Sequence, residues 1–234
     1  MPDTNSKNKL GLIFFLLALL GDIAGIILKN EILQYIFKPL IILALISSFY
    51  FATVTIRTNL RNLIISALLF SWLGDVLLMF QDKKDFFFML GLVAFLIAHI
   101  FYIIFFYKVK RAENFKTSFP IVIFVTAYYA GLIIWLSPFL GDMRVPVYIY
   151  GIVISTMLMM ALHMYPIQFK RAGWLMTAGA IFFVVSDSVL AINKFYQSFE
   201  WAGVLIMLTY GLAQFCIVRG AYFYIHKRHN NHIK

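Results

Sequence analysis

The sequence predicts an all-α integral membrane protein in which a single domain forms a bundle of eight transmembrane helices. Composition is the first reason: 62% of the 234 residues are hydrophobic and 13% are charged, and the mean hydropathy is +0.87. Soluble domains average about 45–50% apolar and about 25% charged residues. The second reason is that the apolar residues form runs of about 20, the length that crosses the hydrocarbon core of a bilayer. The third is that these runs lack the strict apolar/polar alternation of a membrane β-barrel.

Eight apolar runs supply the predicted helices in order along the chain. The first follows the polar segment MPDTNSKNKL and has no small-residue cleavage site, so it predicts a retained helix and not a signal peptide. No polar linker divides the runs into groups, which favours one domain over residues 1–234. The predicted spans are 10–28, 32–51, 61–80, 86–107, 119–137, 146–165, 172–192 and 201–225, followed by a basic tail at 226–234.

The positive charges lie in short clusters between the apolar runs, and the formal net charge is +10. This arrangement argues against a nucleic-acid partner and is typical of the positive-inside pattern, with anionic membrane lipid as the acidic partner. Thirteen Lys and Arg residues lie on the side that carries both termini, and five lie on the other. We therefore expect a multi-pass protein with both termini in the cytoplasm, in the inner membrane if the source is bacterial. The thirteen are Lys7, Lys9, Arg57, Arg61, Lys108, Lys110, Arg111, Lys116, Lys170, Arg171, Lys227, Arg228 and Lys234, and the five are Lys29, Lys83, Lys84, Arg144 and Lys194.

Two of the predicted spans resemble each other. SWLGDVLLMF at 71–80 is similar to FVVSDSVLAI at 183–192, which aligns Asp75 with Asp187, and Gly91 and Gly203 each follow 16 residues later. Both spans run in the same direction. The pattern is compatible with a four-plus-four parallel duplication of the kind found in some membrane folds.

The usual metal and nucleophile motifs are missing. Cys216 is the single cysteine, which excludes an intrachain disulfide and a cysteine-based zinc site. The sequence has no HExxH pair, no GxSxG elbow and no Walker loop. The histidines of the C-terminal segment are interpreted as part of a solvated basic tail. We therefore expect neither a metal nor a cofactor.

Polar side chains inside the predicted spans are the strongest functional candidates, because an aspartate near a helix centre costs about 3 kcal/mol to insert. Asp75 and Asp187 lie equally deep, about 21–23 Å into a core of roughly 30 Å. Lys38 reaches a similar depth from the opposite face, and His99 and Gln214 lie nearer the middle. Three charges at one level, with two polar groups beneath them, predict a common cavity. The neutral residues expected to support it are Ser71, Tyr102, Ser186, Ser188, Asn193 and Tyr210.

Each candidate also has a structural interpretation. An aspartate could tie two helices together or stay neutral by protonation, and Lys38 could extend its ammonium to the interface. His99 could be a core histidine that bonds a neighbouring hydroxyl. Gln214 alone would more often be structural, and Arg219 is expected to contact water or lipid phosphate near the cytoplasmic end.

Five segments follow one another in a characteristic order, and together they resemble the YhhN-like family of membrane proteins, whose vertebrate members are lysoplasmalogenases. The segments are FKPL at 37–40, SWLGDVLLM at 71–79, GLVAFLIAHIFY at 91–102, GAIFFVVSDSVLA at 179–191 and YGLAQFCI at 210–217. The resemblance covers roughly residues 10–225 and implies eight transmembrane helices. It also implies hydrolysis of the vinyl ether bond of lysoplasmalogens to a fatty aldehyde and glycerophosphoethanolamine or glycerophosphocholine. Asp75 matches the family's GD motif, and Asp187 matches its SD motif.

Under this resemblance, Asp75 and Asp187 would share acid–carboxylate catalysis. A vinyl ether is cleaved by protonation of its β-carbon and capture of the resulting oxocarbenium ion by water, a cation similar to that of glycoside hydrolysis. Two carboxyl groups in a low-dielectric pocket cannot both ionise cheaply, so one would be the acid and the other the stabiliser or base. His99 would orient a carboxylate or water, Gln214 would bond water or a glycerol hydroxyl, and Lys38 would pair with the headgroup phosphate. Apolar spans would hold the alkenyl chain.

Two other functions use similar residues. An intramembrane aspartyl protease needs a GxGD motif, but Trp72 stands at the first glycine position and the YD partner is missing. A proton-coupled transporter or lipid-translocating protein is the main alternative, because the aspartates, Lys38 and His99 could relay protons in a duplicated fold. Proton-coupled uptake without product would favour this alternative, and aldehyde release would favour the hydrolase.

Overall fold

A computed structural model describes residues 4–56, 58–81 and 83–233. Within these ranges eight helices are long and apolar enough to span a membrane, which confirms the predicted fold class. Each overlaps one predicted span. The helices are α1 (Thr4–Ile27), α2 (Glu31–Thr53), α3 (Asn59–Leu78), α4 (Asp85–Ala112), α5 (Phe119–Leu136), α6 (Arg144–Leu162), α7 (Lys170–Ala191) and α8 (Ala202–Ile233), and the short η1 (Ser137–Phe139), η2 (Gly141–Met143) and η3 (Ile192–Tyr196) lie between them.

The largest difference from the predicted ends is at the C-terminus, where α8 continues to Ile233 through the segment expected to be a basic tail. Hydropathy marks where a chain leaves the hydrocarbon, whereas backbone hydrogen bonding lets a helix continue into water. The location of the termini in the cytoplasm and the four-plus-four repeat stay predictions.

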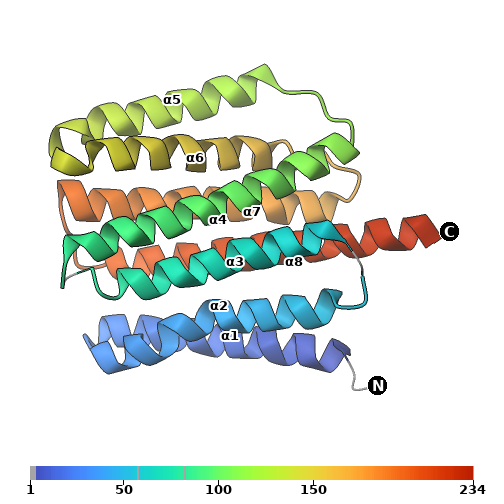
Figure 1. Ribbon diagram of the computed structural model, residues 1–234, viewed down its shortest axis with the longest axis horizontal. Helices are drawn as coiled ribbons and strands as arrows, with labels where there is room; N and C mark the ends of the chain where they lie inside the picture. The colour runs from blue at the N-terminus through green and yellow to red at the C-terminus, as the bar shows by residue number, and fades with distance from the viewer. Residues whose placement is uncertain (1–3, 57, 82, 234) are drawn as a thin grey trace.

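Consecutive helices run antiparallel and stack as a layered bundle (Figure 1). The α1–α2 pair lies at one edge and the α5–α6 pair at the other, with α3, α4, α7 and α8 between them. Both ends of the described chain lie at the same end of the bundle. The α1–α2, α3–α4, α5–α6 and α7–α8 connections lie at the opposite end, which we call the distal end.

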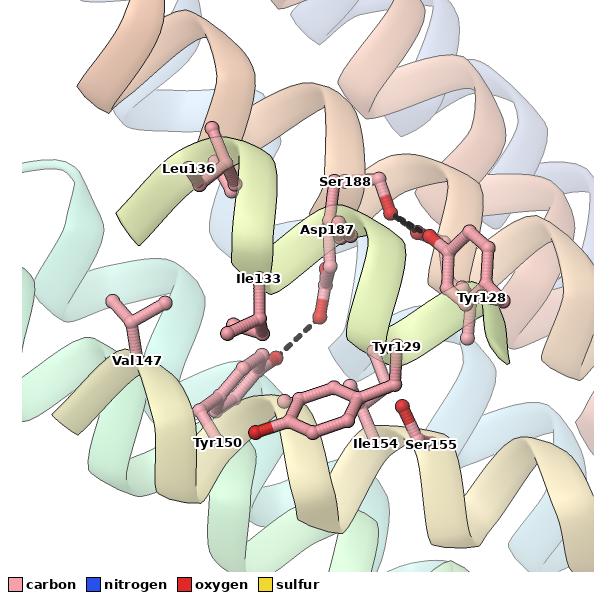
Figure 2. A pocket seen from close by; sticks show the side chains of 14 residues that line it. Tyr128, Tyr129, Ile133, Leu136, Val147, Tyr150, Ile154, Ser155, Asp187 and Ser188 are labelled. Carbon is pink, nitrogen blue, oxygen red and sulfur yellow. Dashed lines mark hydrogen bonds between the residues drawn. The ribbon is translucent and has the colours of Figure 1, made fainter. Parts of the chain in front are cut away.

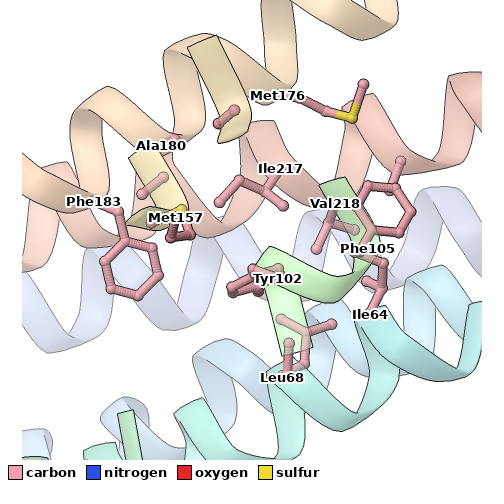
Figure 3. Close-up of a cluster of buried hydrophobic side chains, with 14 of the residues drawn as sticks. Ile64, Leu68, Tyr102, Phe105, Met157, Met176, Ala180, Phe183, Ile217 and Val218 are labelled. Atoms are coloured by element: carbon pink, nitrogen blue, oxygen red, sulfur yellow. The ribbon is translucent and has the colours of Figure 1, made fainter. Parts of the chain in front are cut away.

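The core is centred on α4, whose aromatic side chains fill the space between α3 and the α7–α8 pair. Tyr102 and Phe105 are fully buried and face Leu68 of α3 and Ile217 of α8 (Figure 3). The outer helix α5, in contrast, has exposed apolar side chains, and Ile134 is 74% exposed. Such side chains are suited to lipid contact.

Close helix packing depends on small residues, because membrane helices associate through van der Waals contact and not through the hydrophobic effect. At Gly74 of α3, a Cβ atom would lie 2.6 Å from the ring of Phe95 on α4. The absence of a side chain at Gly74 therefore sets the α3–α4 distance next to Asp75.

The α1–α2 connection is a Schellman turn with an unusual residue. Asn30 donates its N–H to the Gly25 carbonyl (2.8 Å), and Lys29 donates to Ile26 (3.1 Å). These bonds place Lys29 at the left-handed position, with φ = 52°, where glycine is the usual residue. The Asn30 side chain then accepts from the Leu33 N–H and caps α2.

Candidate active site

Asp75 lies near the distal end of α3 and is only 3% exposed. The Tyr210 hydroxyl of α8 donates a hydrogen bond of 2.7 Å to Asp75 Oδ2. Lys38 and Asp187 are both near enough to interact electrostatically with the Asp75 carboxyl group. Both residues are therefore within electrostatic range of Asp75, but Lys38 and Asp187 line separate pockets, so the single common cavity expected from the sequence is not found among the described residues.

A second buried chain of hydrogen bonds joins three more of the predicted supporting residues beside Asp75. The Tyr102 hydroxyl donates to Gln214 Oε1 at 2.6 Å, and Gln214 Nε2 donates to Ser71 Oγ at 3.0 Å. Ser71 and Gln214 lie one helical turn from Asp75 and Tyr210, respectively. The chain of hydrogen bonds joins α3, α4 and α8 beside the Asp75 carboxyl group.

Asp187 forms a separate half of the site, between α5, α6 and α7. The Tyr150 hydroxyl of α6 donates to Asp187 Oδ2, and the Tyr128 and Ser188 hydroxyls are bonded to each other beside it (Figure 2). These side chains line a pocket of about 50 Å³. A cavity needs about 10–15 Å³ to hold one water, so this pocket has room for a few waters and none for a lipid headgroup.

His99 lies between the two halves. Its ring packs edge-on against Phe183 (centroids 4.6 Å apart) and Tyr150 (5.4 Å), and Phe183 packs against Tyr210 at 5.5 Å. A row of aromatic rings therefore connects the tyrosine that holds Asp187 with the tyrosine that holds Asp75. His99 is fully buried, and neither ring nitrogen has a hydrogen-bond partner of good geometry; only the Phe95 carbonyl, one turn earlier, offers a marginal one.

Asp22 of α1 is a buried carboxyl group that the sequence analysis did not select. Its side chain is fully buried, and neither oxygen has a hydrogen-bond partner. It interacts electrostatically with Lys38 and Asp75. The sequence held only a partial signal, because the triplet LGD occurs at 20–22 and 73–75 but also at 140–142, where its aspartate is exposed. Tyr150 and Tyr128 were missed for another reason: tyrosine is common in membrane helices, so the residue type alone did not identify them.

Two predicted supporting residues make local bonds away from the carboxyl groups. Ser186 donates to the Ile206 carbonyl at 3.0 Å and ties α7 to α8. The Asn193 side chain accepts from the Phe199 N–H at 3.2 Å and closes the turn before α8. Among the residues that the structure describes, no group of three or more His, Cys, Asp or Glu is arranged to hold a metal ion.

Lys38 lies between the buried part of the site and a pocket at the distal end of the bundle. It is half-buried and lines a pocket of about 480 Å³ at the distal end, between the α1–α2 and α3–α4 connections. Ile26 and Leu78 also line this pocket, and each lies one helical turn from a buried aspartate, Asp22 or Asp75. The Asp75 half of the site therefore adjoins a cavity large enough for a small organic group.

Comparisons with known proteins found a matching family model and several named relatives. The model of the YhhN family matches residues 33–221. A Mycobacterium bovis protein named lysoplasmalogenase is 32% identical over 167 residues, which are 70% of this chain and 61% of that protein. The human lysoplasmalogenase TMEM86B is 33% identical over 165 residues (68% of this chain and 63% of its own length), and the rat protein of the same name is 30% identical over 160 residues (66% and 59%). The chain thus spans about three fifths of the length of these relatives. No solved structure gives a significant match.

Proposed function

The chain belongs to the YhhN family, and on that premise we propose that it is a membrane hydrolase that cleaves the vinyl ether bond of lysoplasmalogens. The products are a fatty aldehyde and glycerophosphoethanolamine or glycerophosphocholine. Relatives named lysoplasmalogenase, at about a third identity over two thirds of the chain, support this activity. The observation that carries the proposal is the pair Asp75 and Asp187: two carboxyl groups near one end of an apolar bundle, each holding a tyrosine hydroxyl.

The chemistry begins with a proton. One carboxyl group of the pair, in its acid form, protonates the β-carbon of the vinyl ether, and the C=C electron pair forms the new C–H bond. The other carboxylate stabilises the oxocarbenium ion that results. Water then adds to the α-carbon and loses a proton to the carboxylate, and the hemiacetal collapses to aldehyde and glycerol hydroxyl. General acid–base catalysis of this kind contributes about 10²–10⁴-fold in rate.

Other buried groups have supporting roles. Tyr210 and Tyr150 fix the orientation of the two carboxyl groups by hydrogen bonds. Gln214 is oriented by hydrogen bonds with Tyr102 and Ser71, and its side-chain amide forms a hydrogen bond with a glycerol hydroxyl or with water. The Lys38 ammonium pairs with the headgroup phosphate. The apolar walls of the bundle accept the alkenyl chain.

The test compares three lysolipids that differ only at the sn-1 position, incubated with the full chain purified in detergent and followed by mass spectrometry. The vinyl ether is expected to release aldehyde, whereas the saturated alkyl ether is not, because it has no double bond to protonate. The acyl ester tests for an ordinary esterase. In D₂O the aldehyde, trapped at once as an oxime, is expected to carry one deuterium at the carbon next to the carbonyl. Cleavage without this deuterium would refute β-carbon protonation.

Isosteric variants test the two carboxyl groups. Asp75→Asn and Asp187→Asn are each expected to lower the rate of aldehyde release by at least about 100-fold, with unchanged elution in gel filtration. Asp142→Asn, a substitution at an exposed residue of η2 that lines neither pocket, is the matched control. Wild-type rates in either variant of the pair would remove that residue from the mechanism. Proton-coupled uptake of a lysolipid into liposomes, with no aldehyde formed, would favour a transporter.

A further inference from the structure

The distal pocket contains more polar groups than the proposed mechanism uses. It is lined by Lys29, Glu31, Gln34, Lys38, Gln81 and Lys83, together with Ile26, Tyr35, Leu78 and Met79. Its volume of about 480 Å³ falls in the range of about 300–1,000 Å³ usual for small-molecule sites. The three ammonium groups come from two separate connections and one helix, so the fold brings them together from distant parts of the sequence.

We propose that this pocket is the headgroup site of the enzyme, in which Lys29 and Lys83 join Lys38 around the phosphodiester, while Glu31 and Gln81 bind the ammonium of ethanolamine. This inference rests on the proposed function and extends it from the reacting bond to the recognition of the headgroup. The formal charges fit a zwitterion: three cations suit the phosphate, and one carboxylate with a neutral acceptor suits the ammonium.

The depth of the pocket fits the length of the substrate. Leu78 and Met79 line the pocket, and Asp75 lies about one helical turn, roughly 5 Å, deeper along α3. In a lysolipid, three carbons and one oxygen separate the phosphorus from the sn-1 ether oxygen, and these five bonds extend to about 6 Å with standard bond lengths. A phosphate held at the level of Leu78 therefore places the vinyl ether at the level of Asp75.

Lys29 gives independent support, because its backbone conformation is costly for its residue type. It occupies the left-handed position of the Schellman turn, where glycine or asparagine fits without strain. Another Schellman turn, after α4, has Asn114 at the equivalent position, with φ = 57°. Strained residues cluster at functional sites, where the rest of the structure holds them. A lysine kept in this conformation at the rim of a pocket is explained by a role for its ammonium.

Gln81 distinguishes between the two common headgroups. Its side-chain oxygen has no hydrogen-bond partner and is closed to water, so a rotation of the side chain toward the pocket that it lines would let it accept from a ligand donor. The ammonium of ethanolamine has N–H groups to donate, whereas the trimethylammonium of choline has none. The pocket is therefore expected to prefer ethanolamine over choline.

Binding of the water-soluble headgroup product tests the site without catalysis. Isothermal titration of the full chain in detergent with glycerophosphoethanolamine is expected to show binding that is at least about tenfold tighter than that of inorganic phosphate or glycerophosphocholine. Lys83→Gln and Lys29→Gly are each expected to weaken it by about tenfold. Lys84→Gln is the matched control, because Lys84 is the exposed neighbour of Lys83 and does not line the pocket. Gln81→Leu is expected to weaken binding of glycerophosphoethanolamine and leave that of glycerophosphocholine unchanged.

Kinetics of the same variants separate this inference from the proposed function. For lysoplasmalogen cleavage, Lys83→Gln is expected to raise KM with little change in kcat, since it removes binding remote from the reacting bond. Equal affinity of Lys83→Gln and the wild type, or equal affinity for phosphate and glycerophosphoethanolamine, would overturn the headgroup site even if aldehyde is released. Headgroup binding with the expected variant pattern but without aldehyde release would leave the site in place and refute the hydrolase.

Discussion

Replacing Lys29 by glycine is expected to stabilise the protein while weakening headgroup binding. Glycine relieves the strain of the left-handed backbone, and it removes the ammonium proposed to bind the phosphate. A non-glycine residue in the left-handed region costs about 1–2 kcal/mol. Glycine removes this cost but gains about 0.4–1 kcal/mol of additional unfolded-state entropy. The expected net stabilisation of Lys29→Gly is therefore about 0.5–1 kcal/mol.

Two further variants identify the cause of the change. Lys29→Ala keeps the left-handed strain and removes the ammonium, so it is expected to leave stability nearly unchanged while weakening binding. Asn114→Gly acts at the equivalent turn position, where asparagine already tolerates the left-handed region, and is expected to gain less than Lys29→Gly.

The assay is reversible unfolding of the full chain in mixed detergent micelles by titration with SDS, followed by circular dichroism. Unfolding free energies are compared at one micelle composition. If Lys29→Gly were less stable than the wild type, or if Lys29→Ala gained as much as Lys29→Gly, the reasoning from backbone strain would be refuted.

Three further predictions concern buried groups. Gly74→Ala is expected to lower the unfolding free energy by about 1–3 kcal/mol, because the added Cβ disturbs the α3–α4 contact. Gly131→Ala, with no atom within 4 Å of the added Cβ, is expected to be neutral or stabilising. The same SDS titration checks both variants, and equal effects would contradict the packing argument. Tyr210→Phe removes the donor to Asp75 and is expected to cost about 1.5–3 kcal/mol if that carboxyl is ionised and to lower aldehyde release, measured by mass spectrometry. Asp22→Leu replaces a buried carboxyl group without hydrogen bonds and is expected to raise the unfolding free energy by about 1–3 kcal/mol; a loss of stability would show that the interaction of Asp22 with Lys38 outweighs the cost of burying the carboxyl group.

Much of the architecture was predictable because runs of about 20 apolar residues leave few alternatives to a membrane helix. Residue counting along each helix also predicted a similar depth for Asp75 and Lys38, and the structure brings Lys38 within electrostatic range of Asp75. Residue counting did not predict rotation about the helix axis. Ser186 and Asp187 are neighbours in sequence, yet one bonds the α8 backbone and the other a tyrosine of α6. Which residue faces which helix depends on side-chain packing, for which the low amphipathicity of membrane helices gives little signal.

The position of the distal pocket determines where each product goes. In the proposed reaction the headgroup product occupies a cavity open at the end of the bundle opposite the chain termini, whereas the aldehyde is formed among apolar walls. One product therefore leaves to water and the other dissolves in the bilayer. Since the two products separate into different phases as they form, recombination is suppressed without any gate. If the termini face the cytoplasm, the water-soluble product is released on the far side of the membrane.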